Sequence, residues 1–364
     1  MSGIKLSEYY DDRKNNYYSR SDSLRFLLIP FIYIVLLGLP GKYGNYIQTY
    51  CNFIAQVFYI MYGFFTLVPD KAKRLKRLKR KLKDALKLFA VMFISHLVLS
   101  ILYLWLTNSL GALFSSASVI KHSVFNFFVL NVWPLPVGNS IWFVQSLIYA
   151  YIFFIIAEKI GLSKFYVPLL IILSVFTLCT GEFAAFFGFP YHGYPFIPGG
   201  AVTRAIPYML IGMLIRKNVD YLPKIKQFVY VIMFFVGLLL AVGEIELLKH
   251  IGKLVYLGHT IGFGVMAVSL CCVTLAKAKE RKGFISNHGR NYSRRMYALC
   301  QPVALVCWII TFLVIPKYLL FVRVFSSIIS FVISFIIVFI YGMLRVDGIN
   351  LFKKKKKIKD FTIE

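Results

Sequence analysis

Residues 71–107 read KAKRLKRLKRKLKDALKLFAVMFISHLVLSILYLWLT, a strongly basic stretch that changes near residue 88 into a mostly apolar run. The apolar part has the length of about 20 residues that an α-helix needs to cross a bilayer. In the basic part, leucines recur at spacings of three and four with Lys and Arg on the other faces, at Leu75, Leu78, Leu82 and Leu86. This pattern predicts an amphipathic helix on the inner leaflet that runs directly into a membrane-spanning helix.

Apolar segments of this kind recur along the whole chain. Of its 364 residues, 59% are hydrophobic and 16% are charged, whereas soluble domains are about 45–50% apolar and about 25% charged. Because no long polar break separates the segments, we predict one all-α membrane domain, a bundle of about ten transmembrane helices. The ten segments are 24–40, 46–68, 88–107, 140–157, 165–181, 201–215, 228–248, 254–276, 296–315 and 320–344.

The distribution of Lys and Arg predicts how the bundle is oriented. With the N-terminus placed in the cytoplasm, the loops alternate between the two sides, and most of the 42 basic residues fall in inner stretches. This asymmetry is the positive-inside signal, so both termini are predicted to be cytoplasmic. The predicted parts are a tail at 1–23, the membrane domain at 24–345 and a basic tail at 346–364. The basic residues of the outer stretches are Lys42, Lys121, Lys249, Lys253, Lys317 and Arg323.

The formal charge of +27 does not indicate a nucleic-acid partner. The basic residues lie beside apolar segments, where anionic lipid head groups account for them, so the predicted contacts are with membrane lipids. The six cysteines lie in or at the edge of apolar segments and form no CxxC pair. No disulfide framework and no metal site is therefore predicted. The sequence indicates no particular oligomeric state.

Ionisable residues within the apolar segments are functional candidates, because a charge is costly to place in a bilayer. Arg25 lies near the inner end of the first segment, and Arg204 lies at the outer end of the sixth, where it could bind a carboxylate or a hydroxyl-rich ligand. His96 is predicted near mid-membrane and could transfer protons near neutral pH. The alternative role for His96 is a hydrogen bond between helices, since no Asp or Glu lies three or four residues away to orient it.

Three stretches between the spans have two interpretations each. The outer stretches 108–139 and 182–200 are rich in aromatic residues, Pro and Gly and carry almost no charge. They either fold back against the bundle, where irregular backbone must be shielded from lipid, or form interfacial loops anchored by aromatic side chains. The basic stretch 71–87 is either a topology anchor or a cationic platform for a phosphorylated ligand, because the planar fork of Arg matches phosphate oxygens.

Five segments, in this order along the chain, together carry a family resemblance. They are SDSLRFLLIPFIYIVLLG (21–38), FYIMYGFF (58–65), GNSIWFVQSLIYAYIFF (138–154), RAIPYMLIGMLIRK (204–217) and NYSRRMYALCQPVALV (291–306). The set resembles the bacterial integral-membrane acyltransferases called the acyltransferase-3 family. The resemblance implies a protein of the bacterial plasma (inner) membrane. Such a protein would transfer an acyl group from cytoplasmic acyl-CoA, for example acetyl-CoA, to an extracytoplasmic sugar or polysaccharide.

The resemblance also implies where the two substrates bind. The family's paired arginines after the second helix would fall in this chain among Arg74, Arg77 and Arg80. There they would hold the phosphates of the acyl-CoA at the cytoplasmic face. For the acceptor on the outer side, the candidate residues are Arg204, Trp142 and His192.

The chain departs from the family pattern at three positions. Leu36 stands where the family has a histidine eleven residues after the arginine of its opening helix, which is Arg25 here. Cys300 replaces a later histidine, and Tyr62 replaces the serine before the glycine of the second helix. If the chain is an enzyme, another group must serve, and the catalytic candidates are His96, Arg25 and Cys300. The alternative is a catalytically degenerate member that acts as a transporter or scaffold for polysaccharide or lipid-linked intermediates.

Overall fold

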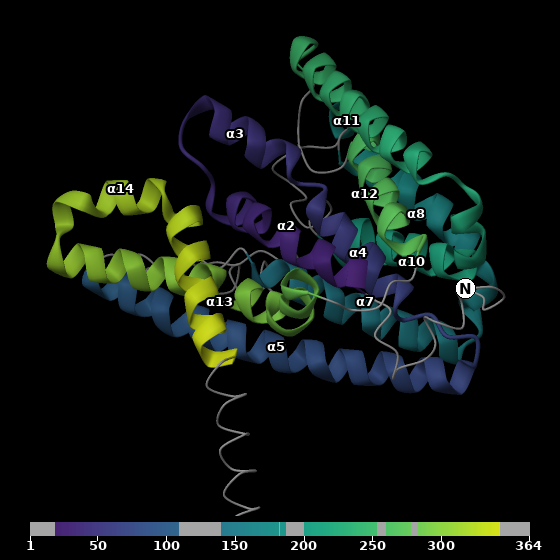
Figure 1. The fold of residues 1–364 in the computed structure, drawn as a ribbon, viewed down its shortest axis with the longest axis horizontal. Helices are drawn as coiled ribbons and strands as arrows, with labels where there is room; N and C mark the ends of the chain where they lie inside the picture. Colours follow the sequence, from purple (N-terminus) through teal and green to yellow (C-terminus); the bar gives the residue numbers. More distant parts are fainter. Residues whose placement is uncertain are drawn as a thin grey trace, which may run out of the picture.

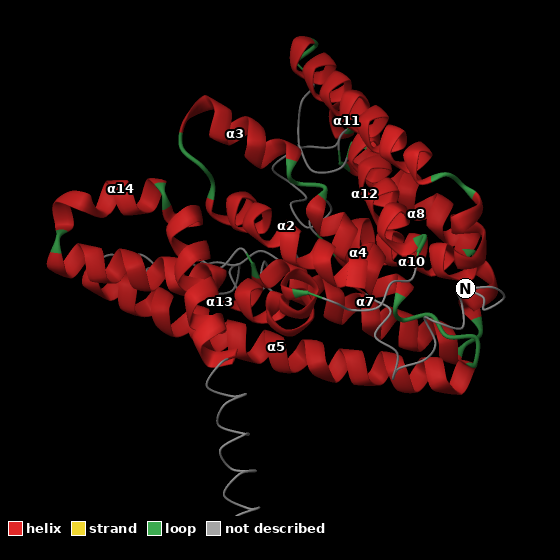
Figure 2. Cartoon of the chain, in the orientation of Figure 1, coloured by secondary structure: helices red, strands yellow, loops and turns green. Residues whose placement is uncertain are grey.

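The described part of the chain is built from helices. The computed structural model describes residues 19–108, 140–181, 183–186, 200–252, 260–277 and 283–342. Within these residues the regular elements are helical and there is no strand (Figure 2). The all-α prediction is therefore confirmed. His192 and most of the two aromatic outer stretches lie outside the described residues.

The order of the helices follows the predicted apolar segments (Figure 1). The longer helices are α2 (Ser19–Leu37), α3 (Gly41–Tyr50), α4 (Ile54–Phe64), α5 (Lys71–Leu106), α7 (Ile141–Lys159), α8 (Tyr166–Thr180), α10 (Ile206–Lys217), α11 (Gln227–His250), α12 (Ile261–Leu275) and α13 (Phe284–Val314). The short α14 (Leu319–Val324) is followed by a helix at Ser326–Gly342. Short 3-10 or π-helical segments lie between them at η2 (Leu162–Phe165), η3 (Ala184–Phe186), η4 (Ala201–Ala205), η5 (Val219–Lys224) and η6 (Pro316–Tyr318).

The number of membrane-crossing helices in the described residues is smaller than the ten predicted. Five helices are long and apolar enough to cross, and seven if each of two bent pairs counts as one span. One bent pair turns by 119° between α2 and the α3–α4 unit, and the other by 86° before Ser326. The remaining candidates are short: the 12 residues of α10 extend only about 18 Å, less than the hydrocarbon core of about 30 Å. The count of ten is therefore not confirmed.

Helix α5 is one continuous helix of 36 residues, as the sequence of its two halves predicts. It begins at Asp70, whose carboxylate accepts hydrogen bonds from the backbone N–H of Ala72 and Lys73 at 2.8 and 3.0 Å and so caps the first turn. The leucine stripe of the basic half does not simply lie on a lipid leaflet. Leu78 is fully buried in the main core and Leu82 packs against that core, whereas Leu86 is exposed.

The contact between α4 and α10 illustrates how closely the helices of the bundle pack. The most extensive contacts join α11 to α12, α13 to α2, α10 to α4 and α5 to α7. Between α4 and α10 two glycines face backbone: a Cβ added at Gly63 would lie 2.0 Å from the carbonyl oxygen of Met209, and one at Gly212 would lie 2.0 Å from that of Ile60. Small residues at such positions let two backbones approach in a membrane protein.

Helix ends that the sequence places on the inner side meet at one end of the bundle. The start of α5 contacts the end of α7 through Arg74 and Glu158, and the start of α2 touches the start of α13 where Gly289 faces the carbonyl of Asp22. The end of α10 lies beside the end of α4, with the guanidinium of Arg216 5.4 Å from the centroid of the Phe64 ring. These contacts bring the start of α2, the end of α4, the start of α5 and the end of α7 to the same end of the bundle.

Candidate functional site

Two of the arginines expected to bind phosphate are engaged by the protein itself. Arg77 donates to the carbonyl oxygen of Phe65 at 3.1 Å, and Arg74 donates to that of Val68 at 3.0 Å. These carbonyls lie at and just beyond the end of α4, where the last C=O groups of a helix lack partners within the helix and attract cations. Both arginines thus stabilise the turn between α4 and α5.

Arg74 is also neutralised by a buried carboxylate. Its guanidinium donates to Oε2 of Glu158 at 2.8 Å, and the side chains of Arg74 and Glu158 are only 13% and 1% exposed. The second carboxylate oxygen, Oε1, accepts a hydrogen bond from the hydroxyl of Tyr166 at 2.9 Å. The charge of Arg74 is therefore balanced within the protein, which leaves it poorly suited to hold an external phosphate.

A second group of cations converges one helical turn further along α5. We call it the Lys81 cluster; it comprises Lys81 with the charges that surround it, Arg25, Arg77, Arg80 and Arg294. The Lys81 ammonium lies 5.5 Å from the centroid of the Tyr62 ring, and Arg294 hydrogen-bonds the same tyrosine.

The Lys81 cluster holds more positive charge than the nearby carboxylates balance. Arg25 forms an ion pair with Asp22 at 3.3 Å, and Asp84 lies near Arg294. Burial, reinforced by the neighbouring guanidinium groups, lowers the pKa of Lys81 to about 7. An anion with several negative oxygens is the ligand that such a cluster favours.

His96 lies at a buried junction of three helices. Its Nδ1 is 2.6 Å from the carbonyl oxygen of Met92, one turn earlier in α5. Its Nε2 is 3.2 Å from Oγ of Ser140, at the start of α7, and 3.2 Å from Oε1 of Gln301 in α13. Tyr297 donates from its hydroxyl to the carbonyl of Ser140. We call Ser140, His96 and Gln301, with these contacts, the His96 network.

Cys300 is not part of the His96 network. It is buried in a separate small core with Ile29, Tyr33, Met296 and Val338. The sequence singled out Cys300, yet the neighbouring Gln301 is the residue that reaches His96. The sequence contains one indication of this role: Tyr297 and Gln301 are four residues apart, so they lie on one face of α13. In the structure both residues contact Ser140.

The two outer candidates that the structure describes, Arg204 and Trp142, lie together. The guanidinium of Arg204 is 5.2 Å from the centroid of the Trp142 ring, a cation–π arrangement, and Arg204 is only 4% exposed. Arg204 belongs to η4, a single π-helical turn that precedes α10. Such turns are rare and frequently occur at functional sites.

Phe143, one residue after Trp142, joins these regions through ring contacts. Its ring is stacked on Tyr59 at 4.6 Å between centroids and lies 5.9 Å from Trp142. It also approaches Tyr297 at 5.6 Å and Tyr62 at 6.3 Å. Tyr62 contacts Lys81 of the Lys81 cluster and Tyr297 donates to the carbonyl of Ser140. The Phe143 side chain therefore connects the Lys81 cluster, the His96 network and the Arg204–Trp142 pair.

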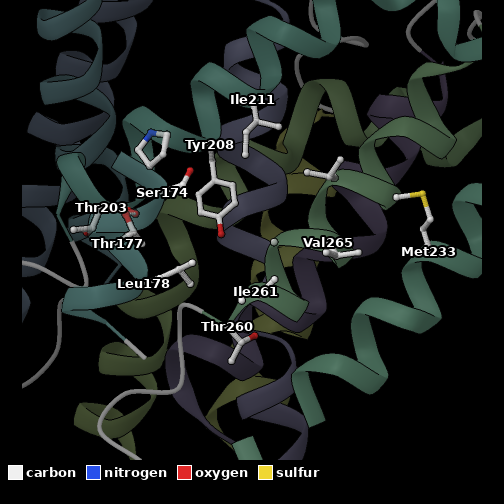
Figure 3. A pocket seen from close by; sticks show the side chains of 13 residues that line it. Ser174, Thr177, Leu178, Thr203, Tyr208, Ile211, Met233, Thr260, Ile261 and Val265 are labelled. Carbon is white, nitrogen blue, oxygen red and sulfur yellow. Dashed lines mark hydrogen bonds between the residues drawn. The ribbon is translucent and has the colours of Figure 1, made fainter. Parts of the chain in front are cut away.

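A separate crevice of about 290 Å³ lies between α8, α10, α11 and α12 (Figure 3). In the close-up the Tyr208 ring projects into the space, with Thr260 and Met233 on the facing helices. Its wall is mostly apolar, with hydroxyls at Ser174, Thr177, Thr203, Tyr208 and Thr260. None of the His96 network lines it. A crevice with this lining suits an aliphatic chain better than a sugar.

Comparison with protein-family models, curated proteins and solved structures found no match to this chain, so its resemblance to the acyltransferase-3 family stays a prediction from its motifs.

Proposed function

We propose that this protein is an acyltransferase-like membrane protein that moves an acyl group from a cytoplasmic acyl-CoA to a hydroxyl of an extracytoplasmic sugar or polysaccharide. The observation that supports it most is the connection of three parts through one aromatic side chain. The Lys81 cluster would hold the donor phosphates, the His96 network would supply acid–base chemistry, and Arg204 with Trp142 would face the acceptor.

The proposal includes a topology and a location. Both termini would be cytoplasmic, the ten apolar segments would each contribute to the membrane domain, and the protein would reside in a bacterial plasma membrane. Support comes from the basic residues at the start of α5 and from the meeting of the predicted inner helix ends. With that orientation the Lys81 cluster faces the compartment that contains acyl-CoA.

The donor site can be tested by binding of acetyl-CoA to the purified protein in detergent. The double variant Lys81→Met with Arg294→Gln should weaken binding by at least about 100-fold, because two charge-assisted hydrogen bonds of about 1.5–3 kcal/mol each are lost. The matched control is Lys73→Met on the same helix: Lys73 is 73% exposed and pairs only loosely with Asp70 at 3.9 Å. Isothermal titration should show unchanged affinity for the control. Equal affinity in the double variant would contradict the donor site.

The pH dependence of acetyl-CoA binding gives an independent check. The pKa of Lys81 is about 7 in the protein, so its ammonium group loses its charge as the pH rises above that value. The phosphates of the ligand, whose second pKa is about 6, stay charged. Affinity should therefore fall between about pH 7 and pH 9, and the fall should disappear in Lys81→Met. Binding titrations at several pH values measure the fall in affinity for the wild type and for Lys81→Met. A fall of equal size in Lys81→Met would show that a group other than Lys81 causes the pH dependence.

The lowered pKa of Lys81 has the opposite effect on the stability of the protein without ligand: stability should rise with pH, whereas affinity for acetyl-CoA should fall. The folded chain holds Lys81 at a pKa of about 7, whereas the unfolded chain binds the proton up to about pH 10.4. Between these values the unfolded state carries more protons, so the free energy of unfolding should rise with pH. Thermal unfolding of wild type and Lys81→Met across this range isolates the contribution of Lys81.

A second candidate function is supported by the crevice between α8 and α11. A scaffold or transporter for lipid-linked intermediates would need a place for an aliphatic chain, and the wall around Tyr208, Met233 and Val265 is largely apolar. This reading predicts binding of a glycolipid without acyl transfer from any donor. Release of CoA from acetyl-CoA by the wild-type protein would favour the acyltransferase; glycolipid binding without release would favour the scaffold.

A further inference from the structure

The hydrogen bonds of the His96 network determine where its protons lie. The carbonyl oxygen of Met92 can only accept, so the nitrogen 2.6 Å away, Nδ1, carries the ring proton of a neutral His96. That leaves Nε2 with a lone pair. Oγ of Ser140 and Oε1 of Gln301 each lie 3.2 Å from Nε2.

Of these two groups, the Ser140 hydroxyl is the one that can donate to Nε2. Oε1 of Gln301 accepts a hydrogen bond from the backbone N–H of Ser140 at 3.0 Å, which fixes the orientation of the amide and makes this atom an acceptor. The hydroxyl of Ser140 therefore has a proton that it can donate to Nε2. It has two acceptors in reach, Nε2 of His96 and Oε1 of Gln301, the latter at 2.9 Å.

The network also accommodates the charged form of His96. Once Nε2 has taken the proton, both ring nitrogens are donors, and each already has an acceptor: the Met92 carbonyl for Nδ1 and Oε1 of Gln301 for Nε2. The position of Ser140 is held meanwhile by the Tyr297 hydroxyl on its carbonyl oxygen. A serine hydroxyl, a base within reach and a third group that orients the base are the arrangement of an activated nucleophile.

We propose that Ser140 is a nucleophile activated by His96, with Gln301 as a positioning residue, and that it carries the acyl group as an ester during transfer. This inference rests on the proposed function. In the first step Oγ of Ser140 forms a bond to the thioester carbonyl carbon, the carbon–sulfur bond breaks, and the Ser140 proton passes through Nε2 to the departing thiolate. In the second step an acceptor hydroxyl attacks the ester, its proton goes to Nε2, and Oγ of Ser140 recovers a proton from there.

The geometry distinguishes Ser140 from other buried serines of the bundle. Ser269 is equally buried, but its hydroxyl donates to the Val265 carbonyl of its own helix at 2.7 Å. A serine bonded only within its helix has no base to remove its proton. Ser269 is therefore the matched control for the reactivity of Ser140.

Labelling of the intact protein with diisopropyl fluorophosphate tests the nucleophile without any donor. Attack by Oγ forms an oxygen–phosphorus bond, fluoride leaves, and the proton goes to His96. Peptide mass spectrometry should find wild type labelled at Ser140 and Ser269→Ala labelled at the same rate. His96→Gln should be labelled about 100-fold more slowly, the size expected for loss of a general base. The wild-type result requires no variant, so a variant that fails to fold leaves the test intact.

The outcomes separate this inference from the proposed function. An unlabelled Ser140, or labelling of equal rate in wild type and His96→Gln, would overturn the nucleophile. Release of CoA by a folded Ser140→Ala variant at the wild-type rate would also overturn it and leave acyl transfer standing. Labelling of Ser140 together with no CoA release from acetyl-CoA would support the nucleophile and contradict the proposed donor.

Discussion

Replacing Glu158 by Gln should lower the free energy of unfolding by about 3–5 kcal/mol, the usual cost of removing one partner from a buried ion pair. Glu158 is 1% exposed and balances the guanidinium of Arg74 at 2.8 Å. Gln is close to Glu in shape and can still accept from Tyr166, so the loss comes from the uncompensated charge of Arg74. Denaturant titration of the protein in detergent, followed by tryptophan fluorescence, measures the change.

The exposed pair of Glu246 with Lys249 is the matched control for Glu158. Its N···O distance is 2.7 Å, close to that of the buried pair, but the side chains are 53% and 38% exposed. Glu246→Gln should therefore cost less than about 1 kcal/mol. Adding Arg74→Met to Glu158→Gln should recover part of the loss, since the buried charge is removed as well. If Glu158→Gln and Glu246→Gln lower the free energy of unfolding by the same amount, the buried ion pair stabilises the protein no more than the exposed one.

Alanine at Gly63 or Gly212 should destabilise the bundle by at least about 1–3 kcal/mol, the cost of overpacking a tight interface. Each added Cβ would lie 2.0 Å from a backbone carbonyl oxygen of the facing helix, and backbone cannot rotate away as a side chain can. The α4–α10 contact would have to separate, which would also displace Tyr62 at the Lys81 cluster. Thermal unfolding and acetyl-CoA binding should therefore both be impaired.

Gly243 in α11 provides the matching substitution where space is open. No atom lies within 4 Å of a Cβ built there, and alanine forms helix better than glycine by about 1 kcal/mol. Gly243→Ala should leave the unfolding temperature unchanged or raise it. Tolerance of alanine at Gly63 and Gly212 to the same degree would mean that the two helices do not approach as closely as described.

Some features follow from the sequence because they are local. The period of three and four in the leucines of 71–87, followed by an apolar run, was enough to predict one continuous helix there, and α5 has that form. The number of spans was harder to predict, because hydropathy measures how apolar a segment is and not how long its helix runs. The α-helices that form in the apolar segments 201–215 and 254–276 are α10 and α12, with only 12 and 15 residues.

In the candidate site, too, some residues can be identified from local sequence, whereas others depend on contacts between residues distant in the chain. His96, Arg204 and Trp142 could be singled out as polar or aromatic residues at notable depths. Arg74 could not be recognised as neutralised, because its carboxylate partner Glu158 lies 84 residues away in the sequence. Lys81 cannot be told from the many other lysines by sequence, because the packing of the helices is what brings Arg25 of α2 and Arg294 of α13 near it.

Local sequence is enough to set the character of each segment, namely its helical form, its apolar surface and its flanking basic residues, because these depend on how a short stretch partitions between water and bilayer. Which faces of the helices meet depends on the packing of the whole bundle. One residue along a helix turns the side chain by about 100°. Cys300 therefore enters one core with Tyr33, while Gln301 points to Ser140 and His96. That rotation is fixed by packing between helices distant in sequence, which no local pattern contains.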